Sequence, residues 1–379
     1  KRQVLRNHME VLDEFPGSEI IGRSYKPLFP GAIDGEGHPS AWTIVGADFV
    51  TTTDGTGVVH TAVMYGEDDY SLGMKVGFPA QHTVGMDGKF IQGTHNDIDG
   101  KYVKECDDII IDLLEKEGLL YREHSYTHDY PHCWRTDHPL LYYAMDSWFV
   151  RMTAVKEKIL QYNSEVEWAP EWTGSKRMGE WLSNIKDWAI SRERYWGTPL
   201  PVWICKECGS EHCVGSIEEL SEMKTESSEM PPELHRPYVD EITLSCPQVK
   251  CDGEMIREPY VMDCWFDSGC ASFAQWHYPF ENGDKFDASF PVDYICEAVD
   301  QTRGWFYSLM AVSTTVFDSI SYRRCLSLGH ILDKDGKKMS KSKGNVVNPW
   351  DHFNKEGADS IRWYICLLYT SDAADDTCC

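Results

Sequence analysis

The residues best suited to chemistry form a lysine-rich loop near the end of the chain. The segment DKDGKKMSKSKGN carries five lysines between Lys334 and Lys343, and its Asp335-Gly336 pair predicts a turn. Such a loop can fold over a triphosphate and neutralise the charge that develops on a departing pyrophosphate. The alternative is a solvated basic loop, which is the usual state of an arbitrary run of lysines.

The elements before this loop predict how it is positioned. The apolar run Val292–Cys296 predicts a strand that ends at Glu297, a helix is expected to open near Thr302, and Cys325–His330 predicts a second strand. Strand, helix and strand in this order indicate a parallel α/β sheet, which binds ligands at the carboxyl ends of its strands. Glu297 could hold a substrate ammonium there, or it could only complement the dipole of the following helix.

Four cysteines have the spacing of a metal site. Cys205 and Cys208 form a C-x-x-C pair, and Cys246 and Cys251 form a wider pair about forty residues later. Two turns of this kind can bring four thiolates around a tetrahedral Zn²⁺, so residues 200–263 are interpreted as a zinc-ribbon-like insertion. Free thiols are the alternative, with Cys213 as a possible substitute ligand.

The composition limits the class of protein and the number of domains. The chain has 379 residues, 42% of them apolar and 26% charged, which fits a folded protein of two domains, or two and an insertion. The net charge of −25 argues against a protein that coats polyanions, but it leaves room for one local basic site. We expect no membrane span and no signal peptide, and the scattered single cysteines favour a cytoplasmic location.

Other segments indicate further secondary structure. Strands are expected at 44–50 and 58–62, separated by a tight turn, and helices at 103–117, 153–162 and 178–188. A helix is also expected to begin at 358–364.

Several motifs together resemble one enzyme family. The KMSKS string at 338–342, after Gly329-His330, resembles the second signature of class I aminoacyl-tRNA synthetases. The block WAISRERYWGTP at 188–199 resembles the isoleucine, leucine and valine branch of that family. The blocks YPHCWR at 130–135, SWF at 147–149, WFDSG at 265–269 and FAQWH at 273–277 are similar to its isoleucine members. The resemblance extends from Lys1 to about Tyr364.

The resemblance implies a fold and an activity. The fold is α/β: the second half of the Rossmann-like nucleotide-binding fold of class I synthetases, with part of a β-rich editing domain and the small zinc-ribbon insertion. The activity is ATP-dependent activation of isoleucine, with Mg²⁺, and its transfer to tRNA(Ile). Lys338 and Lys341 would be catalytic. ATP would be bound by Gly329, His330, Lys338, Met339, Ser340, Lys341 and Ser342, and the aminoacyl-adenylate by Trp265, Asp267, Glu297, Asp300 and Gln301.

A pocket rejects valine, which lacks one methylene of isoleucine, by only about 150-fold, so a second, hydrolytic site is expected. The segments GTGVVHTA at 55–62 and GEDDY at 66–70 resemble the core of the editing domain of this branch. The match implies that Asp69 binds the amino group of the mischarged amino acid and that His60 lies near the sugar and the attacking water. A strand histidine and a solvated acidic loop are the alternatives.

The resemblance also divides the chain. Residues 1–125 would be the C-terminal part of the editing domain, and residues 126–365 the second half of the catalytic domain. Residues 366–379 begin with CLLYTSDAADD, which resembles a translated sequencing adaptor, so we assign them no fold or function. No HIGH-like first signature is present, so we expect an internal fragment that does not form isoleucyl-adenylate alone.

Two other functions stay open at this point. The chain could belong to a valine or leucine enzyme of the same branch, or it could be a stand-alone editing or RNA-binding module. The lysine-rich loop and the Glu297–Trp305 segment argue against the module, because hydrolysis alone has no use for them.

Overall fold

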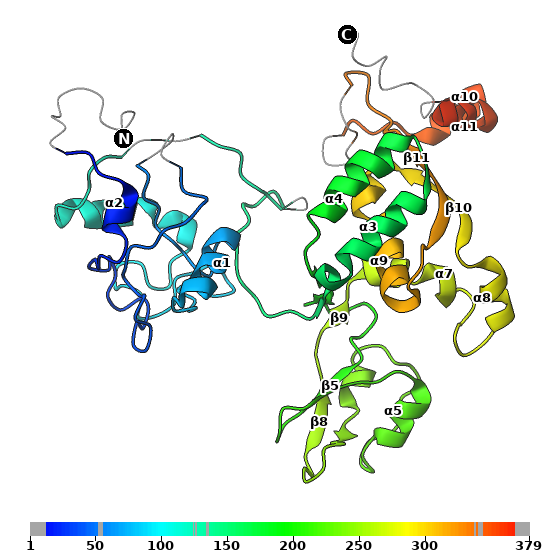
Figure 1. Ribbon diagram of the computed structural model, residues 1–379, viewed down its shortest axis with the longest axis horizontal. Coiled ribbons are helices and arrows are strands. Elements are labelled where there is room, and N and C mark those ends of the chain that lie inside the picture. Colours follow the sequence, from blue (N-terminus) through cyan, green and yellow to red (C-terminus); the bar gives the residue numbers. More distant parts are fainter. Residues whose placement is uncertain are drawn as a thin grey trace. The chain divides into compact units, whose positions relative to one another are not determined.

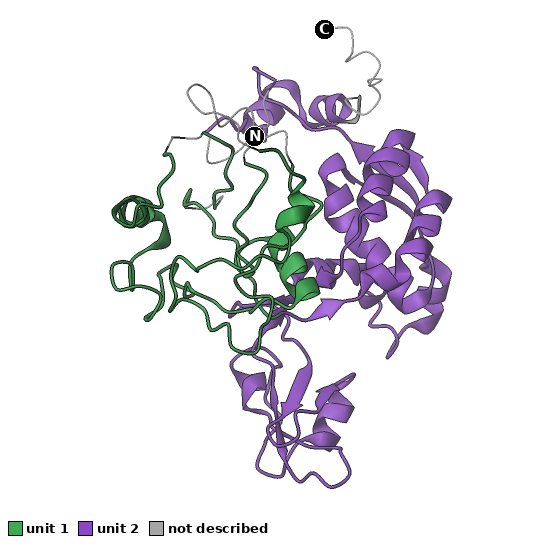
Figure 2. Ribbon diagram, turned by 60° about the vertical axis from the view of Figure 1, so that its left-hand side comes forward, with its two compact units in different colours: residues 1–146 green, residues 147–379 purple. Residues whose placement is uncertain are grey.

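The chain divides into two compact units, Lys1–Asp146 and Ser147–Cys379 (Figures 1 and 2). The computed structural model describes residues 13–51, 56–123, 125, 127–133, 136–336, 339 and 344–367. The boundary between the units follows Asp146, whereas the sequence motifs place the change of domain at residue 125.

The first unit is built mainly from turns and short helices. Its helical elements are η1 (Gly17–Ile20), α1 (Glu67–Val76), η2 (Val103–Glu105) and α2 (Asp107–Lys116). The predicted helix at 103–117 is therefore present as η2 followed by α2. Gly118, with a φ of +71°, follows α2 in a conformation that glycine adopts without strain.

The expectation of a β-rich first unit is wrong for its described residues. Segments 44–50 and 58–62 form no strand, and the pairing in this unit is limited to isolated bridges such as Ser24 with Thr43. Val58 and Val59 are 58% and 55% exposed. β-propensity alone does not make a strand, because a strand needs a neighbouring backbone for its hydrogen bonds.

A parallel sheet organises the second unit. Its strands are β2 (Glu167–Ala169), β10 (Val292–Ala298) and β11 (Tyr322–Leu328), in the order β10-β11-β2. Both pairings are parallel, and α9 (Trp305–Phe317) connects β10 to β11. The predicted strand–helix–strand unit and its parallel sheet are therefore confirmed.

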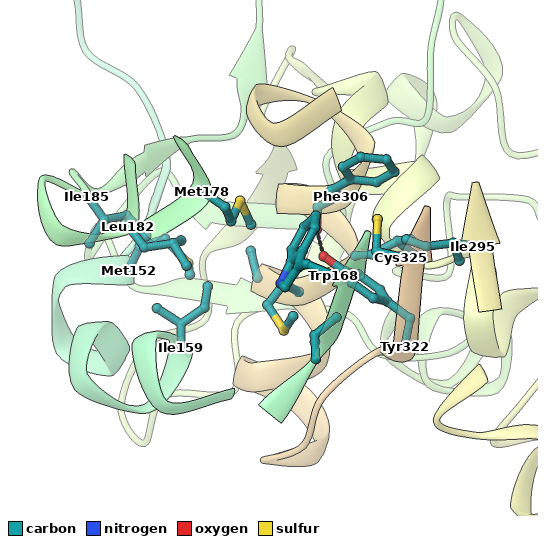
Figure 3. Close-up of a cluster of buried hydrophobic side chains, with 14 residues drawn as sticks. Met152, Ile159, Trp168, Met178, Leu182, Ile185, Ile295, Phe306, Tyr322 and Cys325 are labelled. Atoms are coloured by element: carbon teal, nitrogen blue, oxygen red, sulfur yellow. Dashed lines mark hydrogen bonds between the residues drawn. The ribbon is translucent and has the colours of Figure 1, made fainter. Parts of the chain in front are cut away.

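The main core lies between this sheet and its helices. Helices η3 (Met152–Val155), α3 (Lys156–Glu165), α4 (Gly179–Ser183) and α9 contribute apolar side chains that meet those of the strands (Figure 3). Trp168 of β2 packs edge-on against Phe306 and Tyr322, and the Tyr322 hydroxyl donates a hydrogen bond to the Phe306 carbonyl over 3.1 Å. Burial of each such aromatic side chain stabilises the fold by about 1.5–3 kcal/mol.

The predicted helix at 178–188 is only partly correct. The chain forms a π-helix, η4 (Thr173–Met178), then α4, and then enters β3 (Trp188–Ala189), which pairs antiparallel with β1 (Phe149–Val150). Glycine at position 174 of η4 leaves space for Trp168, because a Cβ there would lie 2.1 Å from the indole ring.

An inserted module leaves this unit through a two-stranded neck. Strand β4 (Ser191–Arg192) pairs antiparallel with β9 (Val261–Met262). Between them lies an antiparallel sheet in the order β6-β5-β8-β7, formed by β5 (Val202–Cys205), β6 (Glu211–Cys213), β7 (Leu244–Ser245) and β8 (Glu254–Arg257). The module also contains α5 (Ile217–Met223) and η5 (Tyr238–Glu241), and it has its own core around Trp203.

Short helices complete the second unit. They are α6 (Cys264–Gly269), α7 (Ala271–Ala274), α8 (Gly283–Ser289), η6 (Val299–Arg303), α10 (Pro349–Glu356) and α11 (Ala358–Leu367). The backbone of α11 continues two residues beyond Ile365, where the sequence predicts the adaptor-like tail to begin. None of the helices in the described part of the chain is both long and apolar enough to cross a membrane.

Candidate active site and metal centre

The candidate active site lies at the carboxyl ends of the parallel strands. In the register of the sheet, Glu297 of β10 is opposite Ser327 of β11, and Leu326 is opposite Ala169 of β2. Glu297 is exposed, and Gly329 directly follows the last residue of β11. The sheet therefore brings the predicted ammonium-binding carboxylate and the start of the predicted nucleotide-binding segment to one edge.

Helix η6 holds the next two predicted residues. The Gln301 side-chain oxygen accepts a hydrogen bond of 2.9 Å from the Trp305 backbone N–H, which caps the first turn of α9. The Gln301 amide lies 3.5 Å from an Asp300 carboxylate oxygen, and Asp300 is exposed. Gln301 is thus held by the helix that it caps, while Asp300 faces solvent.

Trp265 of α6 lies beside η6. A Cβ on Gly304 would come within 3.0 Å of the Trp265 ring and 2.5 Å of the Gln301 side-chain oxygen. The indole N–H of Trp305 donates to the carbonyl of Ser268 over 3.0 Å, which joins α6 to α9. Trp265 remains 40% exposed, so one side of the indole is available as an apolar wall.

Asp267 points to the neck of the inserted module. Its carboxylate accepts a hydrogen bond of 3.0 Å from the Thr198 hydroxyl, and burial raises the pKa of the Asp267 carboxyl. No described contact joins it to Glu297 or Gln301. Trp265 and Gln301 therefore lie together at the helix that follows β10. Asp267 instead contacts the Arg192–Pro199 segment.

Asp263 lies outside the sequence motifs, yet it connects the block at 188–199 to the block at 265–269. Asp263 caps α6 by accepting from the Trp265 backbone N–H at 3.1 Å, and it accepts hydrogen bonds from the side chains of Arg192 and Trp188. It is 4% exposed. Aspartate is a preferred residue directly before a helix, but the sequence analysis predicted no helix after Asp263, and nothing local signals the partner 71 positions away.

The lysine-rich loop is described at its two ends and at Met339. Lys338, Ser340, Lys341 and Ser342 lie outside the described residues, while Met339 is half-buried. Before them, Gly336 has a φ of +71° and donates to the Asp333 carbonyl, which matches the predicted turn. After them, the Asn345 amide donates to the Asp333 carboxylate over 2.6 Å, so Asp333 joins the two ends of this loop.

In the first unit, the structure connects the two predicted editing segments. The Asp69 carboxylate, in the first turn of α1, accepts a hydrogen bond of 3.3 Å from the Ala62 backbone N–H, two residues after His60. A Cβ on Gly66 would lie 2.9 Å from that carboxylate, so glycine gives it space to turn back. His60 is exposed and Asp69 half-buried.

The four predicted cysteines meet in the inserted module. The sulfur atoms of Cys205, Cys208, Cys246 and Cys251 all lie within 4.8 Å of one another. Two sulfur pairs are 3.6 Å and 3.7 Å apart, far longer than the S–S bond of about 2.05 Å in a disulfide. Ligands about 2.3 Å from a tetrahedral zinc ion place the sulfur atoms about 3.8 Å apart, so this donor set fits Zn²⁺.

The surroundings of the cluster favour a thiolate at Cys208. Hydrogen bonds with Ser210 lower the pKa of the Cys208 thiol to about 6. A Cβ on Gly253 would lie 2.8 Å from the Cys205 sulfur, so a larger residue would crowd the cluster. Cys213 is exposed and is not a member of the cluster, which does not support its proposed role as substitute ligand.

Gly304→Ala should lower the free energy of unfolding of the second unit by about 1–3 kcal/mol, because the new methyl group would displace Gln301 or Trp265. Urea unfolding followed by circular dichroism measures this change. Gly283→Ala is the matched control, since no atom lies within 4 Å of its added Cβ. Equal stability of the two variants would contradict the close approach of Trp265 to η6.

Comparisons with known proteins agree with this architecture. A family model of the tRNA synthetases class I (I, L, M and V) matches residues 25–377. The chain therefore belongs to the class I tRNA synthetases of this group.

Individual relatives indicate which members of this family the chain resembles. Proteins named isoleucine–tRNA ligase from Clostridium novyi and Clostridium acetobutylicum are each 50% identical to this chain, over 373 and 370 residues. Isoleucine–tRNA ligase 2 of Bacillus cereus is 48% identical over 366 residues. These matches cover 97–98% of this chain but only 35% of each relative, so the chain spans about a third of their length.

A solved structure of methionyl-tRNA synthetase from Mycobacterium tuberculosis, in complex with methionyl-adenylate, matches 62% of this chain and 36% of its own length. It is 19% identical, with a TM-score of 0.39.

Proposed function

We propose that this chain is part of an isoleucine–tRNA ligase, which activates isoleucine with ATP and Mg²⁺ and transfers it to tRNA(Ile). The observation that carries the proposal is that Glu297 lies at the end of β10, beside the end of β11, while Gln301 and Trp265 meet around Gly304 at the helix that follows β10. The names of relatives about 50% identical over nearly the whole chain support the choice of isoleucine.

Each residue has a role in this proposal. Glu297, with Asp300 and Gln301 beside it, binds the ammonium group of isoleucine, and the face of Trp265 contacts its aliphatic side chain. The isoleucine carboxylate attacks the α-phosphorus of ATP in line, and the bond to the bridging oxygen of pyrophosphate breaks. Lys338 and Lys341 stabilise the negative charge that moves onto the pyrophosphate, while Gly329 and His330 contact the nucleotide. Catalysis is thus positioning and electrostatics, with no side-chain nucleophile.

Pyrophosphate exchange tests this proposal. The protein is a chimera in which this chain replaces the matching segment of the Clostridium novyi relative, which is 50% identical over 98% of the chain. We expect isoleucine to stimulate exchange more strongly than valine or leucine. A stronger response to valine or leucine would overturn the choice of isoleucine, and no response to any of them would overturn the synthetase site.

We also propose that the first unit contributes to hydrolytic editing of valyl-tRNA. The hydrogen bond between the Asp69 carboxylate and the backbone beside His60 supports a shared site. An anionic side chain is required because the amino group of the mischarged valine is a cation at neutral pH.

Asp69→Ala in the chimera should slow hydrolysis of valyl-tRNA and let mischarged product accumulate, because the ammonium group loses its counter-charge. Pyrophosphate exchange with isoleucine should stay near the unaltered rate. Lys341→Ala is the reciprocal variant and should slow exchange while hydrolysis continues. If each variant reduced both activities equally, the assignment of two separate sites would be refuted.

A structural Zn²⁺ held by Cys205, Cys208, Cys246 and Cys251 completes the proposal. The ion would join the β5–β6 turn to the segment between β7 and β8, and its chemistry there is cross-linking rather than catalysis. We expect no redox or hydrolytic role for it, since four thiolates fill a tetrahedral coordination sphere.

A further inference from the structure

We infer that Arg177 is a positioning residue that fixes η6, the helix that carries Asp300 and Gln301. The inference rests on the proposed role of η6 in the amino-acid pocket, and it adds a residue that lies outside every motif described above. The observation behind it is a hydrogen bond of 3.0 Å from Arg177 Nε to the Thr302 hydroxyl, between residues 125 positions apart.

The backbone that carries Arg177 is fixed to the core. Helix η4 follows β2, whose end lies at the same sheet edge as the ends of β10 and β11. The Gly174 carbonyl accepts a hydrogen bond of 3.1 Å from the buried Asn163 amide, and Gly174 packs closely on Trp168. Single-turn π-helices are frequent at functional sites, because the wider turn redirects the side chains that follow.

The Thr302 hydroxyl both accepts and donates a hydrogen bond within this part of the unit. It accepts from Arg177 and donates to the Val299 carbonyl over 2.9 Å, and Thr302 is 0% exposed. The hydroxyl therefore ties the first turn of η6 to η4.

A second contact joins the same two segments. The Arg303 guanidinium lies 5.1 Å from the centre of the Trp181 ring in α4. Residues 177 and 181 thus contact η6 from η4 and α4, while the Gln301 side chain bonds to the first residue of α9. Because η6 is only five residues long, these contacts set where Asp300 and Gln301 lie.

Hydrogen exchange on the chain itself tests the link. Arg177→Ala should accelerate amide exchange at Gly304 and Trp305 by about threefold to tenfold, because both amides bond to Gln301 in η6. Lys176→Ala, which removes the exposed neighbouring cation, is the matched control and should change nothing.

Thr302→Val removes the acceptor with little change in volume, but it also removes the hydrogen bond to the Val299 carbonyl, so it should accelerate exchange at least as much as Arg177→Ala. The double variant should then be no faster than Thr302→Val alone, because that variant has already removed the interaction with Arg177. Unchanged exchange in Arg177→Ala, an equal change in the control, or additive effects in the double variant would each overturn the link.

Activation kinetics in the Clostridium novyi chimera test the positioning role. Arg177→Ala should raise the KM for isoleucine about tenfold and leave the KM for ATP unchanged, and Arg177→Lys should restore part of the loss. An equal rise in both KM values, or a fall in kcat alone, would contradict the role. If the unaltered chimera shows no isoleucine-dependent exchange, the proposed function fails, and the hydrogen-exchange result still decides the Arg177–Thr302 link.

Discussion

Glu297→Gln is expected to reduce kcat/KM for isoleucine by about 30-fold to several-thousand-fold in the chimera. Loss of one partner from a hydrogen-bonded charge pair costs about 2–5 kcal/mol, and the ammonium group of isoleucine would lose its main counter-charge. Most of the loss should appear in the KM for isoleucine, while the KM for ATP stays near its original value. Steady-state pyrophosphate exchange at varied isoleucine concentration measures both.

Asp293→Asn is the matched control for Glu297→Gln. Asp293 lies on the same strand, β10, but near its amino end, and its side chain is 92% exposed. Its loss should leave activation unchanged. If both variants lose activity alike, or if Glu297→Gln activates isoleucine normally, the ammonium site is elsewhere.

Removal of the metal is expected to unfold the inserted module. Structural Zn²⁺ sites contribute about 10–16 kcal/mol of apparent binding free energy at neutral pH, more than a small two-layer module can replace. After chelation, or in Cys251→Ser, the amides of β5 and β8 should exchange rapidly. The amides of β10 and β11 should stay protected, since the core of the parallel sheet is separate.

Cys213→Ser provides the control for the metal prediction. Cys213 is an exposed thiol on β6, next to the strand that carries Cys205, but outside the cluster. This variant should bind one zinc ion per chain and keep its exchange pattern. Unchanged protection of β5 and β8 after complete chelation would rule out a structural metal.

The parallel sheet edge was predictable because its signals are local. A mostly apolar run, Val292–Cys296 with Asp293 as its one charged residue, marks β10, and the helix and strand that follow it are long enough to be recognised. Since parallel strands end at a common edge, the place of Glu297 followed from that order alone. Strand β2 has only three residues and exists because it pairs with β11, so no local pattern revealed it.

Other features depend on contacts that are distant in sequence. Val58–Ala62 has strand-forming residues but no pairing partner among the described residues. The strand predicted there from β-propensity is therefore wrong. Asp263 and Arg177 act through partners 71 and 125 positions away, and single-residue patterns carry no record of such pairs. The cysteine spacing, by contrast, was sufficient to predict that the four thiols meet. Each pair lies on one turn, and the pairing of β5 with β8 brings the two turns together.

The most direct test of the adenylate pocket is hydrogen exchange of the chimera with and without a non-hydrolysable sulfamate analogue of isoleucyl-adenylate. We predict that the analogue slows exchange in η6, in the first turn of α9 and in α6 around Trp265. Exchange in β5 and β8 of the inserted module should not change. Binding of the analogue with protection confined to other segments would contradict the central claim that this sheet edge holds the activated amino acid.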